Sequence, residues 1–110
     1  MNNRLAIYTF TASDNAIASI PSGKYWVVKS IVVANTDATA RTFRLHHAPA
    51  NEASSVQNAL HYDVRLAANS TISLLDEGVQ LWLIEGESLR GLASAASVVT
   101  IHVYGEERSG

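Results

Sequence analysis

The sequence predicts an all-β fold, an antiparallel, jelly-roll-like β-sandwich with about eight to nine strands. Three observations support this prediction. Apolar and polar residues alternate with a period of two in several segments, and two further segments are rich in β-branched and aromatic residues. Turn-forming residues separate these segments at intervals of about ten residues, which is typical of sandwiches and barrels rather than of βαβ units.

Three segments alternate clearly and are predicted to be strands with one buried and one wet face. In residues 60–66 every even position is apolar and every odd position is polar. Residues 41–47 place Phe43 and Leu45 on the apolar side, and residues 99–104 repeat the pattern. We expect the apolar side of each strand to face the core.

Two segments, residues 25–34 and 79–84, are apolar almost throughout. Continuous apolar runs of this kind are typical of central strands that are buried on both faces. Trp26 and Trp82 lie in these runs, so we expect both to be core residues. Four weaker strands are predicted at residues 5–10, 16–20, 71–75 and 88–93.

Turn residues such as Gly, Asn, Asp and Ser connect the predicted strands. They occur at residues 21–23, 35–37, 67–70, 76–78 and 85–87. The longest loop is residues 48–58, and residues 53–60 within and beside it favour a helical turn. The polar ends, residues 1–4 and 106–110, are expected to be flexible unless they dock on a partner.

Length and composition limit the architecture and the partners. A chain of 110 residues is expected to form one domain, residues 1–110, and it contains no cysteine. Neither a signal peptide nor an apolar stretch of about 20 residues is present, so a soluble protein without membrane contact is expected. Eight Lys and Arg residues are scattered along a chain of net charge −2, which argues against nucleic acid as a partner.

Only 16% of the residues are charged, against about 25% in average soluble domains. We interpret this low fraction as a sign that other subunits cover part of the surface. The alternative is a weakly charged surface with no partner.

Residues with catalytic potential form no recognisable motif. His46, His61 and His102 fall on predicted polar faces, where imidazoles that converge around a threefold axis would bind zinc or nickel. Without HxH or HExxH spacing, we instead predict that they are solvated or hydrogen-bonded strand residues. The acidic pairs lie in turns, and neither a GxSxG elbow nor a glycine-rich phosphate loop is present. No enzymatic activity, cofactor, metal or small-molecule substrate is therefore expected.

The aromatic residues allow two further hypotheses. A Trp82 side chain that pointed outward would be a natural anchor for a subunit interface. Carbohydrate stacking on Trp82 or Tyr25 is the other hypothesis.

Six segments of the chain resemble a group of small β-sandwich virion proteins of tailed bacteriophages. They are IPSGK (20–24), VKSIVVANT (28–36), FRLH (43–46), LAANSTI (66–72), EGESLRG (85–91) and VTIHVYG (99–105). The resemblance spans roughly residues 15–106 and consists of strand and turn patterns. It includes no shared site motif, so no functional residue is transferred from that group.

The resemblance implies a non-enzymatic component of the virion, assembled in the host cytoplasm. The expected role is capsid decoration: a cement protein, as a homotrimer, binds the major capsid protein on the capsid exterior. The alternative is a tail-fibre or tail-tip component that acts as a receptor-binding, glycan-binding or adaptor module. A cellular trimeric domain of lectin or cupin type is a third possibility, but the spaced His-x-His and Glu set of a metal-binding cupin is missing.

Partner contacts are expected from the long loop, from the N-terminal segment 1–10 and from the tail that begins at Glu106. The candidate contact residues are Asn51, Glu52, Ser54, Ser55, Trp82 and Arg4.

Overall fold

The computed structural model describes residues 3–49, 52, 54–74 and 80–109. This part of the chain consists of strands and one short 3-10 helix. In chain order the elements are β1 (Asn3–Thr9), β2 (Asn15–Ser19), β3 (Lys24–Asn35), β4 (Arg41–Ala48), η1 (Val56–Asn58), β5 (Ala59–Leu66), β6 (Ser70–Ser73), β7 (Leu81–Leu83), β8 (Ser88–Ala93) and β9 (Val99–Ser109). No helix in the described ranges has the length and apolar character needed to cross a membrane.

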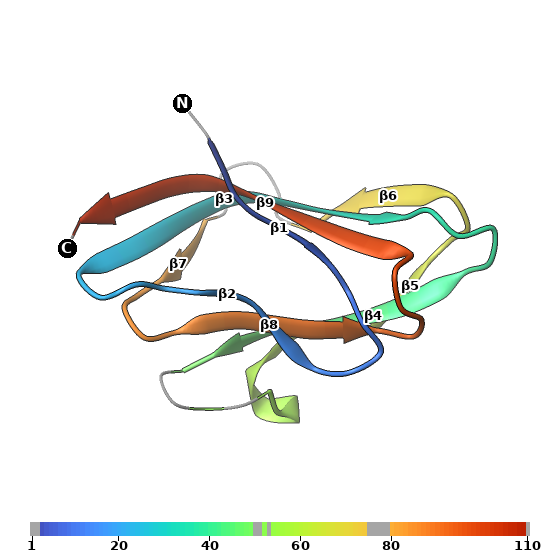
Figure 1. The fold of residues 1–110 in the computed structure, drawn as a ribbon, viewed down its shortest axis with the longest axis horizontal. Helices are drawn as coiled ribbons and strands as arrows, with labels where there is room; N and C mark the ends of the chain where they lie inside the picture. Colours follow the sequence, from blue (N-terminus) through green and yellow to red (C-terminus); the bar gives the residue numbers. More distant parts are fainter. Residues whose placement is uncertain (1–2, 50–51, 53, 75–79, 110) are drawn as a thin grey trace.

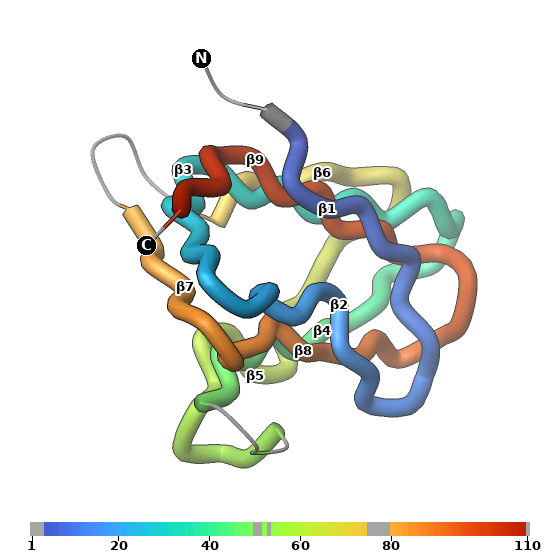
Figure 2. The backbone as a smooth tube through the Cα atoms, turned by 60° about the vertical axis from the view of Figure 1, so that its left-hand side comes forward, coloured from blue at the N-terminus to red at the C-terminus, as the bar shows by residue number. Residues whose placement is uncertain are grey.

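The strands form two antiparallel sheets that pack face to face, as Figures 1 and 2 show. The first, sheet A, has the order β1-β9-β3-β6, and β7 also pairs with β3. The second, sheet B, has the order β2-β8-β4-β5. If β7 is set aside, the first strand pairs with the last, the second with the second last, and so on inward. This nested pairing is that of a jelly roll and confirms the predicted fold class.

The longest pairing joins β3 and β9 through the middle of sheet A. It runs from Lys24 opposite Ser109 to Asn35 opposite Val99, with one irregularity beside Lys29. Apolar and polar residues alternate along β9 as predicted, with Val99, Ile101 and Val103 buried. The central position that the sequence predicts for residues 25–34 is confirmed.

The described residues of both polar ends, 3–4 and 106–109, take part in this sheet. Residues 106–109 were expected to be flexible unless they dock on a partner. They instead continue β9 and form antiparallel pairs with Lys24–Val27. The indole N–H of Trp26 donates to Glu107 Oε2 at 2.9 Å, which ties this segment to the core edge. Arg4 lies in β1 opposite Tyr104. The prediction relied on polar composition and was wrong. The strand β3 is long enough to pair with these polar residues at the exposed end of the sheet.

The core lies between the two sheets and is made of the inward residues of both. Phe10, which follows β1, stacks on Phe43 of β4 with ring centroids 6.4 Å apart. At one end, the buried Asn35 donates to the carbonyl groups of Thr39 and Ala67, each at 3.1 Å. These bonds connect the two loops there. The main core cluster comprises Phe10, Ile20, Trp26, Val28, Ile31, Val33, Phe43, Leu45, Leu66, Leu83, Leu89, Ala93, Val99, Ile101 and Val103.

The prediction for residues 60–66 is wrong in its first half. Leu60 and Tyr62 face outward, with exposed fractions of 42% and 45%, whereas His61 lies opposite the inward Leu45. The pairing with β4 shifts between these residues and Val64, and Asp63 has a φ of 51°. Such a bulge adds one residue to the strand. The even-numbered residues therefore face outward before the bulge and inward after it.

The prediction of a central strand at residues 79–84 is also wrong. The strand β7 has three residues and pairs with β3 alone. Leu83 points into the core, but Trp82 is 50% exposed, so only Trp26 is the core tryptophan that the sequence predicts. An apolar run indicates that a segment packs against other residues. It does not indicate which strands lie beside the segment in the sheet. The predicted turn at residues 76–78, Leu75 and Val79 lie outside the described residues.

We predict that Gly105→Ala lowers the free energy of unfolding by about 2 kcal/mol or more. A Cβ at Gly105 would lie 2.0 Å from the carbonyl oxygen of Val27, so the central pair of strands would have to separate. The comparison variant is Gly23→Ala, where a Cβ meets no atom within 4 Å. Its cost is limited to the left-handed backbone, about 1 kcal/mol. Urea unfolding of both variants checks this, and an equal loss for the two would contradict it.

We also predict that stability falls as the pH drops below about 6.5 because of His61. Burial against the Phe43 ring, whose centroid is 6.2 Å away, holds the pKa of His61 below its ordinary value of 6.5. The unfolded chain therefore binds a proton at that position more readily than the folded chain. The free energy of unfolding of His61→Gln should fall less than that of the parent between about pH 7.5 and about pH 5.5. Equal losses would refute this assignment.

Candidate functional site

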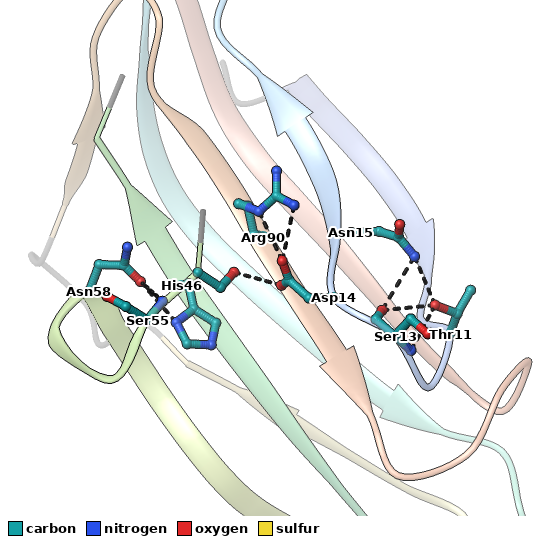
Figure 3. A network of polar contacts seen from close by, with 9 residues as sticks. Thr11, Ser13, Asp14, Asn15, His46, Ser55, Asn58 and Arg90 are labelled. Atoms are coloured by element: carbon teal, nitrogen blue, oxygen red, sulfur yellow. Dashed lines mark hydrogen bonds and ion pairs between the residues drawn. The ribbon is translucent and has the colours of Figure 1, made fainter. Parts of the chain in front are cut away.

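In the described part of the loop between β4 and β5, Ser54 and Ser55 lie over the outer face of sheet B. Figure 3 shows the polar contacts that hold them there. The Ser54 hydroxyl donates to Asp14 Oδ1 at 2.6 Å, and the same carboxylate accepts two hydrogen bonds from Arg90 of β8. The loop is therefore attached to residues that lie far away in the sequence.

A second attachment lies at the end of the loop, at η1. The side-chain oxygen of Asn58 accepts hydrogen bonds from the backbone N–H of Ser55 at 3.0 Å and from His46 Nδ1 at 2.9 Å (Figure 3). His46 is nearly fully buried although it belongs to the outer face of sheet B, because η1 and the edge of the Tyr62 ring cover it. The predicted helical turn is confirmed, and it is fixed to the sheet.

The neighbouring part of sheet B carries an aromatic and ionic contact. The Arg44 guanidinium lies 4.1 Å from the centre of the Tyr62 ring. It also donates two hydrogen bonds to Asp63, at 2.6 and 3.1 Å. The bond from Arg44 holds the pKa of the Asp63 carboxyl below its ordinary value. Asp63 therefore joins the bulge in β5 to β4.

Between the loop and sheet B there is a shallow pocket of about 280 Å³, lined by Asp14, Arg44, His46, Ser54, Ser55, Val56, Tyr62 and Leu92. Each of its two charged lining residues is paired with a neighbour outside the lining: Asp14 binds Arg90, and Arg44 binds Asp63. We conclude that this polar network positions the loop.

The outer surface beside this pocket is apolar. Val56 of η1 is 74% exposed and is one of the most exposed large apolar residues in the described chain. Leu60 and Tyr62 of β5 are exposed as well, and Tyr62 lines the same pocket as Val56. We refer to Val56, Leu60 and Tyr62 as the loop patch.

Sheet A carries a second exposed surface, at its β7 end. Tyr25 of β3 and Trp82 of β7 stack nearly parallel, with an interplanar angle of 10° and centroids 5.5 Å apart. Val27 lies directly opposite Trp82 and is buried, yet it is not part of the main core cluster. The outward Trp82 side chain thus lies beside the buried Val27 on the outer face of sheet A.

The two rings border a pocket of about 440 Å³, which we call the aromatic pocket and which is lined by Gly23, Lys24, Tyr25, Trp82, Ile84 and Glu85. Glu85 Oε1 accepts the backbone N–H of Gly23 at 2.8 Å. A hydrogen bond from the Ser22 side chain, together with that of Gly23, holds the pKa of Glu85 below its ordinary value. The pocket therefore combines an apolar wall with an ionised carboxylate.

The candidate contact residues do not form one site. Trp82 belongs to sheet A, whereas Ser54 and Ser55 lie on the loop over sheet B. Ser54 is used in binding Asp14, while Glu52, Ser55 and Arg4 are exposed. Asn51 lies outside the described residues.

Sequence reasoning missed the loop patch. Leu60 and Tyr62 were assigned to the core because the bulge at Asp63 leaves no trace in the alternation. Val56 did carry a signal, since it is the one large apolar residue among the small and polar residues of the loop. Such a residue marks a contact surface when it joins others in an exposed apolar patch.

The histidines lie in different environments. His46 contacts the loop, His61 faces the core, and His102 stacks on Tyr104 on the outer face of sheet A. His61 thus does not lie on a polar face as predicted. In the part of the chain that the structure describes, no three His, Asp or Glu side chains gather in a way that would hold a metal ion.

Comparisons with protein-family models, with curated proteins and with solved structures find no match to this chain.

We predict that Asp14→Ala releases the loop. The substitution removes the acceptor for Ser54 and leaves the partly buried Arg90 without its carboxylate. A charged hydrogen bond of this kind contributes about 1.5 to 3 kcal/mol. Backbone amides of residues 54–58 should exchange hydrogen faster by mass spectrometry, while those of β3 and β9 keep their rates. Ser13→Ala, which changes the adjacent residue, is the matched control. Unchanged exchange in the loop of Asp14→Ala would contradict the anchoring role.

Proposed function

We propose that this chain is a non-enzymatic structural protein of a tailed-phage virion, which decorates the exterior of the assembled capsid as a cement protein. In this proposal its partners are the major capsid protein and further copies of itself in a homotrimer. The segments that resemble small virion proteins support it, and a jelly roll is a fold that viral capsid proteins often use. The low charged fraction of 16% suits a surface that other subunits cover.

The observation that carries the proposal is the loop patch. Three large apolar side chains are exposed together on a loop and strand that are fixed to sheet B by Asp14, Arg90 and Asn58. A preorganised surface loses little conformational entropy on binding, so more of the contact energy remains for affinity. Arg44 and Asp63 lie beside Tyr62 as a polar rim, the arrangement that many protein interfaces have.

Binding to the assembled shell alone is sufficient to stabilise it. A protein that binds the shell and not its free subunits contributes RT ln(1 + [L]/Kd) for each site, which is about 2.7 kcal/mol when the free concentration is one hundred times Kd. A trimer that contacts several neighbouring subunits gains further through the high effective concentration of its linked sites. Many weak contacts of this kind produce a stable particle without any chemical step.

We predict that the double variant Val56→Asp, Leu60→Asp folds normally but loses binding to purified shells. Both side chains are exposed, so the core is unchanged, whereas two carboxylates in an apolar contact would lose their hydration. Affinity should fall at least about 100-fold, which corresponds to about 2.7 kcal/mol. Cosedimentation of the chain with emptied shells measures it.

Ala96→Asp is the matched control because it adds a carboxylate at an exposed turn between β8 and β9, away from the patch. It should bind shells as the parent does. Equal occupancy of shells by the double variant and the control would refute a role of the loop patch in decoration.

A further inference from the structure

We infer that the aromatic pocket on sheet A is a binding site for a neutral saccharide. This inference does not rest on the proposed role in decoration, because the aromatic pocket and the loop patch belong to opposite sheets. It follows from the shape of the pocket, from its aromatic wall and from the carboxylate at its rim.

The platform in the aromatic wall is the part of the Trp82 ring that the stacked Tyr25 ring leaves exposed. Because Tyr25 and Trp82 are stacked almost parallel, they do not form the cage of crossed rings that encloses a compact ligand. Half of the Trp82 residue is exposed although Tyr25 packs against it, and Ile84 beside it is 58% exposed. The face of an aromatic ring carries partial negative charge. The C–H groups on one face of a pyranose carry partial positive charge, so a sugar ring stacks on such a platform.

The rim provides a hydrogen-bond acceptor. Glu85 is an ionised acceptor, held in place by the N–H of Gly23. Sugar hydroxyl groups donate hydrogen bonds, so a carboxylate at the rim complements them.

Gly23 lines the pocket. It has a φ of +75°, which the turn before β3 requires and which glycine adopts readily. A Cβ at this position would meet no atom within 4 Å, so the space beside the backbone is free. The pocket volume of about 440 Å³ lies within the range of roughly 300 to 1,000 Å³ that small-molecule sites have.

The charges around the pocket favour a neutral ligand over a cation. An organic cation would also stack on Trp82. It would, however, approach Arg108, which interacts with the Tyr25 hydroxyl, and among the lining residues Glu85 is the carboxylate that would offset this repulsion. Glu106 is already engaged by Arg108 and Lys29. A neutral saccharide avoids this repulsion and still uses the aromatic platform.

Nuclear magnetic resonance of the full-length chain tests the inference, with maltose, cellobiose, lactose and chitobiose as probes. The indole N–H signals of Trp82 and Trp26 report on two different parts of the molecule. Trp82 donates to Gln80 at 3.3 Å at the surface, whereas Trp26 donates to Glu107 from the core edge. At least one disaccharide should shift the Trp82 signal in a saturable way and leave the Trp26 signal in place.

Variants link the binding to the platform. Trp82→Ala should weaken binding at least about tenfold, which corresponds to about 1.4 kcal/mol. Trp82→Phe, which keeps an aromatic face, should stay within about threefold of the parent, because it loses ring area only. An unchanged Trp26 signal in both variants shows that each is folded. The double variant of the loop patch should bind the sugar as the parent does, so the two proposals fail independently.

A sugar could reach the pocket as a free saccharide or within a polysaccharide chain. Soluble starch in parallel with maltose separates these sources, since added contacts along a chain lower the Kd. The inference is overturned if none of the saccharides shifts Trp82 saturably, if Trp82→Ala binds as well as the parent, or if tetramethylammonium binds more tightly than every saccharide.

Discussion

The pairing of β3 with β9 is the constraint on which the rest of the structure depends. It places a twelve-residue strand beside an eleven-residue strand across the whole length of sheet A. The strands β1, β6 and β7 are all added to this pair, and the core residues of sheet A come largely from it. Gly105 allows the two backbones to lie close at Val27, which is where a side chain would separate them.

The sequence predicts those parts of the fold in which a strand has regular neighbours. Phe43, Leu45, Val99 and Ile101 are buried as their alternation requires, because β4 pairs regularly with β8 and β9 pairs regularly with β3 at these positions. Residues 60–62 fail because a single positive φ at Asp63 reverses the facing of the strand. The site is harder still, since its parts meet only in three dimensions. Ser54 binds Asp14, forty residues away, and no local pattern indicates such a pair.

The two exposed surfaces divide the molecule by sheet. Sheet B carries the loop patch on a network of buried or half-buried polar bonds, and sheet A carries the aromatic pocket beside β7. If the loop patch binds a shell, sheet A would face away from it, and the aromatic pocket would remain accessible. A decoration protein that also binds saccharide needs this arrangement. Trp82 was expected in the core, and its outward position is what makes the second surface possible.

The central claim is that this chain decorates an assembled particle through sheet B. Electron microscopy of intact virions purified from the cells that make the protein tests it most directly. The account predicts many symmetry-related copies on the capsid exterior, with η1 and the start of β5 against the shell and Trp82 toward solvent. Density confined to the tail, or particles that lack the chain altogether, would contradict it.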